Sequence, residues 1–214
     1  GVDYFIVLTN SESLFTYSAE DFMNKILKKL GVKEVFVGTD YRFGHGASGS
    51  VADLRKHFDV HAFELLSTKD GKISTSTIIK SLDDGDVEKA NELLGYDYQI
   101  RGVVGYGNQV GNKIGFPTAN LDIAANYVLP KNGVYKTICY VDGKPYLALT
   151  NIGVHPTLGA SDRVLVESYL LHYEGNAYGK TMYVAFLSRL RDEKKFDDVA
   201  DLKKQIAIDL DSIK

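Results

Sequence analysis

The segment GNKIGFPTANL, residues 111–121, ends with a threonine and an asparagine two positions apart, directly after a glycine-rich stretch. Side chains alternate between the two faces of a β-strand, so Thr118 and Asn120 are expected to lie on the same face. The apolar residues between and beside them would occupy the opposite face. A hydroxyl and an amide that share one face can hold a cation or a phosphate.

The stretch before Thr118 is rich in glycine. Its glycines stand at positions 102, 105, 107, 111 and 115. Their spacing matches neither a P-loop nor a dinucleotide fingerprint, because no G-x-x-x-x-G-K-[ST] is present and no helix pattern follows. Glycines let backbone N–H groups approach phosphate oxygens closely, as in a phosphate-binding flap. The spacing of the glycines alone favours a flexible hairpin between two strands. The Pro-Thr-Ala-Asn sequence directly after it shifts the balance toward the flap.

Glu167 is a carboxylate within the apolar strand pattern VLVESYLLHY. Burying a charge is costly unless the charge is paired or used. Glu167 is therefore either a residue at a sheet edge or in a salt bridge, or it serves as a general base or polar anchor.

The segment LSRLRDEKKFDD, residues 187–198, mixes charges with a single aromatic residue. Its local pattern is typical of a solvated loop that ends at a helix N-cap, Asp197 or Asp198. The functional alternative is a lid in which Arg191 and Phe196 contact a planar ligand.

Composition excludes several classes of protein. The chain has 214 residues, 44% of them hydrophobic, a formal net charge of -3 and one cysteine, Cys139. No basic field attracts nucleic acid, no internal disulfide is possible, and no apolar run approaches the ~20 residues of a membrane helix. The five histidines show no metal-ligand spacing, and no signal peptide is visible at the start. We therefore expect a cytoplasmic protein without a nucleic-acid, membrane or obligate protein partner.

Residues 1–96 alternate strand-like and helix-like segments, which predicts a parallel α/β domain. Strands are expected over 3–8, 34–38 and 60–65. Helices are expected from Ser18, where Asp21 completes a capping box ahead of an apolar stripe that includes Leu30, and over 51–58 and 84–94.

Residues 97–214 are rich in strands. Asp142-Gly143 is a strong hairpin signal, and VLVESYLLHY and TMYVAFLSRL are interpreted as a further strand pair. A last helix from Asp198 to Leu210 carries Val199, Leu202 and Ile206 on its apolar stripe. The sequence thus predicts a small antiparallel β-barrel closed by a C-terminal helix.

The second half of the sequence resembles riboflavin kinase. The stretches GNKIGFPTANL, GVYKTICYVDG, NIGVHPTL, VESYLLHYEGNAYGK and LRDEKKFDDVADLKKQI occur in that family's order and together cover about residues 98–214. The resemblance implies an enzyme that transfers the γ-phosphoryl group of MgATP to the 5′-hydroxyl of riboflavin and forms FMN.

The same resemblance implies roles for individual residues. Thr118 and Asn120 would meet Mg²⁺ and the ATP phosphates, and the 105–115 loop would fold over them. Glu167 would be the catalytic base. The flavin would be bound by Arg191, Lys194 and Phe196, and the ATP loop would contribute Gly105, Gly107, Gly111, Lys113 and Gly115. Tyr169 stands where the family often has histidine.

The first half resembles a partial FMN adenylyltransferase domain, which is a Rossmann-like nucleotidyltransferase. VGTDYRFGHGASGSVADL is similar to that family's G-x-D-F-R-F-G stretch, and ISTSTIIKSLDDGD to its S-S-T-x-I-R segment. The family's H-x-G-H motif is absent, and Lys80 replaces the usual arginine. We therefore expect FMN but not FAD from this chain, with about the first third of a bifunctional FAD synthetase missing.

Two further hypotheses belong to other functional classes. One is a non-catalytic regulator that binds flavin or nucleotide on the same barrel; the joint presence of Thr118, Asn120 and Glu167 argues against it. The other is a nucleic-acid-binding barrel, which the acidic balance of the chain and the lack of interleaved basic and aromatic residues disfavour.

Overall fold

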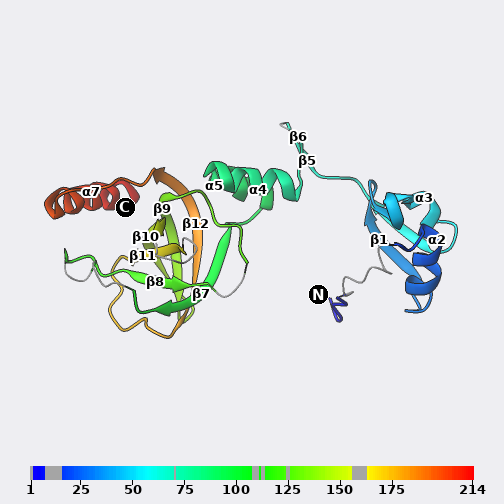
Figure 1. Ribbon diagram of the computed structural model, residues 1–214, viewed down its shortest axis with the longest axis horizontal. Helices are drawn as coiled ribbons and strands as arrows, with labels where there is room; N and C mark the ends of the chain where they lie inside the picture. Colours follow the sequence, from blue (N-terminus) through cyan, green and yellow to red (C-terminus); the bar gives the residue numbers. More distant parts are fainter. Residues whose placement is uncertain are drawn as a thin grey trace. The chain divides into compact units, whose positions relative to one another are not determined.

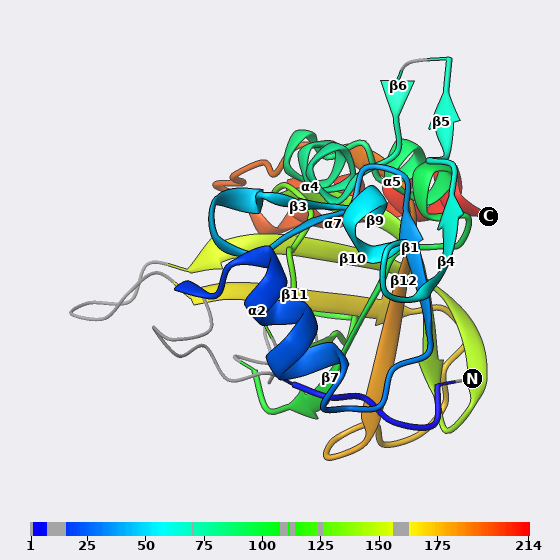
Figure 2. The ribbon, with the colours of Figure 1, turned by 90° about the vertical axis from the view of Figure 1, so that its right-hand side faces the viewer.

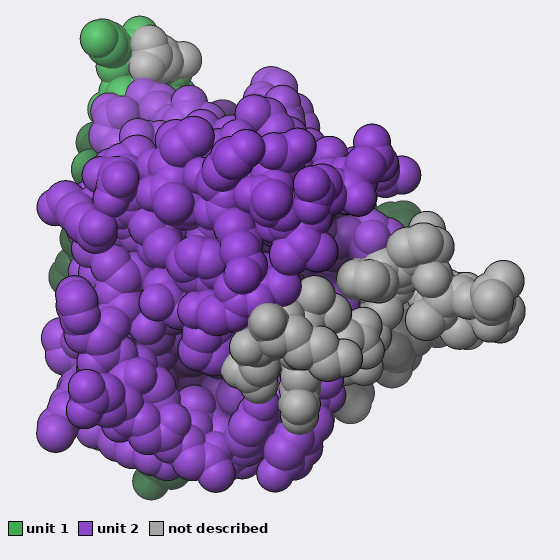
Figure 3. All heavy atoms as spheres, turned by 90° about the vertical axis from the view of Figure 1, so that its left-hand side faces the viewer, with its two compact units in different colours: residues 1–73 green, residues 74–214 purple. Residues whose placement is uncertain are grey.

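The computed structural model describes residues 2–7, 16–69, 71–107, 111, 114–123, 126–155 and 163–214. The chain divides into two compact units, residues 1–73 and residues 74–214 (Figure 3).

The first unit contains the expected parallel strand pair. Strands β1 (Glu34–Gly38) and β4 (Asp59–Phe63) run parallel, with Val35 opposite Val60. Helix α2 (Ala19–Phe22), which continues as a π-helical turn over Met23–Leu27, and α3 (Val51–Leu54) form the core together with Phe43. Two short hairpins complete the unit: β2 (Arg42–Phe43) with β3 (Gly49–Ser50), and β5 (Ser67–Thr68) with β6 (Gly71–Lys72).

The strand expected over residues 3–8 does not form within the described residues, and Leu8 lies outside them. Tyr4 and Phe5 are 87% and 88% exposed, and residues 2–7 carry no strand assignment. A strand requires a hydrogen-bonded neighbour, whereas the described parallel sheet pairs β1 with β4 alone. Ser18 caps α2 as expected, but Leu30 of the predicted stripe lies in an exposed turn.

The second unit contains the predicted barrel. Six strands close in the order β10-β11-β8-β7-β12-β9 (Figures 1 and 2). Their bounds are β7 Gln99–Gly105, β8 Ala119–Asp122, β9 Gly133–Val141, β10 Lys144–His155, β11 Arg163–Leu170 and β12 Thr181–Arg191. Every neighbouring pair is antiparallel. Closure leaves no open sheet edge in the barrel.

The hairpin at Asp142-Gly143 forms as predicted, with φ of 51° and 75° at the two turn residues. The expected pairing of VLVESYLLHY with TMYVAFLSRL is wrong. β11 lies between β10 and β8, whereas β12 lies between β7 and β9. Barrel closure, rather than adjacency along the chain, determines these neighbours.

The helix expected over residues 84–94 forms as α5 (Val87–Leu94), and a further helix that was not predicted, α4 (Thr75–Asp84), precedes it. Gly85 ends α4 in a left-handed conformation, φ 83°, and the Asp86 side chain caps α5. Both helices pack on the barrel: Leu82, Val87 and Ala90 belong to its buried core. The compact units therefore differ from the expected domain limits 1–96 and 97–214, which remain a prediction about functional modules.

Helix α7 (Val199–Ile213) begins at Asp198, whose side chain accepts a hydrogen bond from the Ala200 N–H. Leu210 and Ile213 pack against Val134 and Leu149 of the barrel, while Val199 is exposed. Among the described residues, no helix is long and apolar enough to cross a membrane.

Candidate active site

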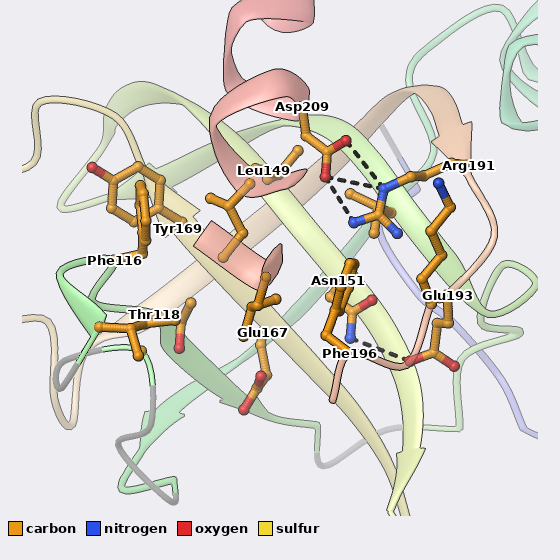
Figure 4. Close-up of a pocket in the computed structure, with 16 residues that line it drawn as sticks. Phe116, Thr118, Leu149, Asn151, Glu167, Tyr169, Arg191, Glu193, Phe196 and Asp209 are labelled. Atoms are coloured by element: carbon orange, nitrogen blue, oxygen red, sulfur yellow. Dashed lines mark hydrogen bonds and ion pairs between the residues drawn. The ribbon is translucent and has the colours of Figure 1, made fainter. Parts of the chain in front are cut away.

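A pocket of about 230 Å³ lies between the outer face of the barrel and α7 (Figure 4). Its walls are mainly apolar and include Phe116, Leu149, Phe196 and Ile206. Polar side chains enter it from several different strands, so only the folded barrel brings them together.

One cross-strand row, called the polar row below, supplies Glu167, Asn151 and Arg191 to this pocket. Consecutive partners across five neighbouring strands are Asn120 on β8, Glu167 on β11, Asn151 on β10, Val134 on β9 and Arg191 on β12. Directly opposed residues in an antiparallel sheet place their side chains on the same face, about 4.5–5.5 Å apart at Cβ. In Figure 4 the Glu167 side chain lies between Thr118 and Asn151.

Glu167 lies on an interior strand of the closed barrel, with hydrogen-bonded neighbours on both sides. This excludes the sheet-edge interpretation of its carboxylate. Glu167 is partly buried and lines the pocket.

The glycine-rich stretch comes very close to the polar row. A Cβ on Gly107 would lie 2.3 Å from the Asn120 amide nitrogen, and one on Gly111 would lie 3.1 Å from the Thr118 hydroxyl. A larger residue at position 107 would collide with the Asn120 side chain, and one at position 111 would collide with the Phe116 carbonyl oxygen. A Cβ on Gly105 would meet the Asp122 carboxylate, and Gly115 adopts a φ of +87°. Lys113 lies outside the described residues.

Thr118 lines two pockets. Besides the pocket under α7, it contributes to a second one whose other walls include Pro117, Leu170, Tyr173 and Tyr178. Ala119 and Leu121 are buried in the barrel core, so Thr118 and Asn120 face the other way, as the alternation predicted.

Arg191 is anchored to α7. Its Nε donates to both carboxylate oxygens of Asp209, at 3.1 and 3.0 Å, and its Nη2 lies 2.7 Å from Oδ2. Gln205 also donates to Asp209 at 2.9 Å, and the Lys194 ammonium donates to Gln205 at 3.3 Å. The guanidinium is therefore held at the pocket wall by a buried carboxylate, and Lys194 and Phe196 line the same pocket.

Sequence reasoning missed Asp209, Asn151 and Glu193. Asp209 interrupts the apolar end of α7 four residues after Gln205, and Asn151 shares a strand face with Leu149; both polar interruptions were visible signals. The Asn151 amide donates to Glu193 Oε1 at 3.4 Å. Phe116 and Tyr169 form an edge-to-face pair on the other side of the pocket, 5.6 Å apart.

The barrel interior holds a separate chain of hydroxyl groups. Thr137 and Thr150 approach at 2.7 Å, and Thr150 and Ser168 at 2.8 Å, all fully buried. Burial raises the pKa of the neighbouring Cys139 thiol to about 11, although these hydroxyls oppose the shift. These three hydroxyl groups join β9, β10 and β11 behind the polar row.

The barrel carries an apolar pocket with a carboxylate, and a threonine and an asparagine lie beside a glycine-rich stretch. This combination is typical of a barrel enzyme that acts on a small molecule. The Riboflavin kinase family model matches residues 94–214, and the FAD synthetase model matches residues 1–81. The chain belongs to the riboflavin kinase family. Its activity is the ATP-dependent phosphorylation of riboflavin to FMN.

Individual relatives agree with this assignment. The chain is 32% identical to the Bifunctional riboflavin kinase/FMN adenylyltransferase of Listeria monocytogenes over 98% of its length and 68% of that protein. It is 33% identical to the protein of the same name from Bacillus subtilis, with the same coverage. A solved structure named Macrolide-efflux Protein from Streptococcus pneumoniae is 31% identical, with a TM-score of 0.87 over 94% of this chain and 66% of that one. This chain thus spans about two thirds of the length of these relatives.

Proposed function

We propose that riboflavin and ATP meet at Thr118, with the flavin in the pocket under α7 and the nucleotide in the second pocket. The observation that carries this proposal is that Thr118 lines both pockets, while Glu167 lines only the first. Aromatic and aliphatic walls under α7 suit a planar ring system. The acceptor hydroxyl would then lie beside Glu167, at the end of the flavin pocket nearest the nucleotide.

The donor groups near Thr118 fit a magnesium ion. A hydroxyl and an amide oxygen, on Thr118 and Asn120, are the hard oxygen ligands that Mg²⁺ accepts, and ATP phosphates complete such a site. When bound, the ion neutralises charge that develops on the transferred phosphoryl group. The close approach of Gly107 and Gly111 to these residues would allow backbone N–H groups to contact the phosphates of a bound nucleotide.

Glu167 is proposed as the base that accepts the proton of the riboflavin 5′-hydroxyl. It lies directly opposite Asn120 in the strand register, so base and phosphate ligands are neighbours. Phosphoryl transfer depends mainly on such positioning and charge neutralisation.

Phe196 and Lys194 are proposed to contact the flavin. Arg191 is proposed to meet the flavin from a fixed position, because its guanidinium is bound to Asp209. For this chain we propose that FMN is formed without FAD, because the sequence lacks the H-x-G-H motif of the adenylyltransferase family. The partners are proposed to be ATP and riboflavin, in the cytoplasm.

The test measures FMN and FAD formed from riboflavin and MgATP by the chain and its variants. Thr118→Ala should raise the KM for MgATP, and Phe196→Ala should raise the KM for riboflavin. Thr181→Ala, an exposed threonine on β12 away from the pocket under α7, is the matched control and should change neither. The converse pattern, with Thr118→Ala affecting only riboflavin, would show that the two pockets are assigned the wrong way round. Binding without turnover in the unmodified chain would support the regulator hypothesis.

A further inference from the structure

Two arginines flank an irregularity near the end of β12. Arg189 pairs with Tyr135 and Arg191 pairs with Val134, so two neighbouring residues of β9 lie opposite residues that are two apart on β12. Such a bulge re-aims the side chains that follow it. Arg191 therefore shares the face of Val134 in the pocket, while Arg189 shares the face of Tyr135.

Arg189 is tightly enclosed by neighbouring groups away from the pocket. Its Nη2 donates to the Asn132 carbonyl at 2.6 Å, and its Nε donates to the Tyr135 hydroxyl at 3.3 Å. A Cβ on Gly85 would lie 2.7 Å from Arg189 Cδ, and one on Gly133 would lie 2.8 Å from Nη2. Only 18% of the side chain is exposed. These contacts leave the guanidinium little freedom to move.

The fixed guanidinium also holds the first residue after β12. Arg189 Nη2 donates to Asp192 Oδ1 at 2.7 Å, while Arg191 Nη1 donates to the Asp192 carbonyl at 2.9 Å. The guanidinium of Arg189 lowers the pKa of the Asp192 carboxyl, so that group is charged at neutral pH. Asp192 is thus bound through its side chain by one arginine and through its backbone by the other.

The residues that follow Asp192 are those that enter the flavin pocket: Glu193, Lys194 and Phe196 line it. We infer that Arg189 is a positioning residue for riboflavin, which acts through Asp192 to fix the start of this segment. The inference rests on the proposed placement of the flavin under α7. It gives Arg189 a role in substrate affinity although its side chain does not line the pocket.

The experiment compares Arg189→Gln, Asp192→Asn and the double variant. The carboxylate of this ion pair is exposed, which makes the pair weak, so each change should raise the KM for riboflavin about two- to fivefold. The KM for MgATP should stay unchanged, and the double variant should be no worse than Arg189→Gln alone. Asp192 is 77% exposed, so Asp192→Asn tests the inference even if Arg189→Gln does not fold.

Arg101→Gln is the matched control. Its guanidinium also lies over a tyrosine ring, 5.7 Å from the Tyr183 centroid compared with 5.9 Å between Arg189 and Tyr135. Arg101, however, lies on β7 and lines a different hollow, with Gln99, Tyr140 and Lys180. It should leave both KM values unchanged. A purely structural role for Arg189 predicts lower thermal stability, no effect of Asp192→Asn and no change in riboflavin KM; that result would overturn the inference.

Phe196→Ala separates this inference from the proposed function. If Phe196→Ala raises the riboflavin KM but Arg189→Gln and Asp192→Asn do not, the flavin site stands and the positioning role is wrong. If all three variants keep the normal riboflavin KM, both are wrong. Titration of riboflavin fluorescence without ATP should show the same order of affinities.

Discussion

At the scale of single residues, Glu167 is the side chain proposed above as the catalytic base. It is placed by two strand neighbours, opposite Asn120 on one side and Asn151 on the other. Both neighbours are neutral amides that can orient a carboxylate without removing its charge.

Glu167→Gln retains the size and hydrogen-bonding reach of the side chain but removes the base. We expect kcat to fall about 10²–10⁴-fold, with the affinities for riboflavin and MgATP nearly unchanged. Steady-state kinetics with circular dichroism on the same sample would check this. A folded variant with nearly normal kcat would show that positioning alone carries the reaction.

Cys139 gives a prediction about pH. An unfolded thiol ionises near 9, whereas burial raises the pKa of Cys139 to about 11. Between these values the unfolded chain releases a proton that the folded chain keeps, so stability should decrease as pH rises from about 9 to 11. Below pH 9 both states are protonated and the effect vanishes. The decrease in the free energy of unfolding between pH 8 and pH 10.5, measured with urea, should be smaller for Cys139→Ala than for the unmodified protein. Equal decreases would contradict the raised pKa of Cys139.

Sequence reasoning correctly placed residues whose relation follows from local alternation. It missed residues that are brought together only when the barrel closes. Thr118 and Asn120 are two residues apart in one strand pattern, so alternation alone placed them on one face. Asn151 and Glu167 are joined only by the register of β10 and β11. The ion pair between Arg191 and Asp209 joins a strand to a helix, and nothing in the local pattern of either residue indicates the other.

At the scale of elements, the hydroxyl chain of Thr137, Thr150 and Ser168 ties three strands together behind the polar row. Thr150 stands between the other two, so its replacement affects both. Polar cross-links of this kind fix the register of the strands as well as their stability.

Thr150→Val keeps the side-chain shape but leaves Ser168 and Thr137 without their shared partner. Thr137 retains the Ala148 carbonyl at 3.3 Å. We expect a loss of about 1–3 kcal/mol in the free energy of unfolding, measured with urea. Adding Ser168→Ala should recover part of it, and the exposed Thr181→Val should cost little. An unchanged stability would mean that the chain of hydroxyls contributes nothing.

Helix α4 shows why one element escaped prediction. Its sequence, TSTIIKSLDD, is rich in threonine, serine and isoleucine, which have modest helix propensity. The helix forms because Ser74 and Thr77 cap its start and Leu82 is buried in the barrel core. Tertiary packing therefore outweighs local preference in this segment.

At the scale of the whole molecule, α4 and α5 belong to the barrel in space although the sequence pattern groups them with the first half. The Asn91 side chain secures this attachment. It donates to the Phe186 carbonyl at 2.8 Å and accepts from the Tyr98 N–H at 2.7 Å. The barrel core thus extends back to Leu82, against which Ile78 packs.

A protein of residues 74–214 should consequently be more stable than one of residues 97–214. The shorter form lacks Leu82, Val87 and Ala90, whose burial contributes about 5 kcal/mol. Urea denaturation of both forms would measure the difference. Equal free energies of unfolding would show that the two helices pack on the barrel without stabilising it.

Because β12 pairs irregularly with β9, the number of residues in β12 determines which side chains face the pocket. Register shifts occur between Phe186 and Ser188 and again between Arg189 and Arg191. Leu190 is the extra residue that lets Arg191 lie opposite Val134, so its substitution would alter one side chain. Inserting or deleting one residue in the regularly paired part of the strand would instead move every later residue to the opposite face. Homologous enzymes should therefore tolerate varied residues in this stretch far better than insertions or deletions of a single residue.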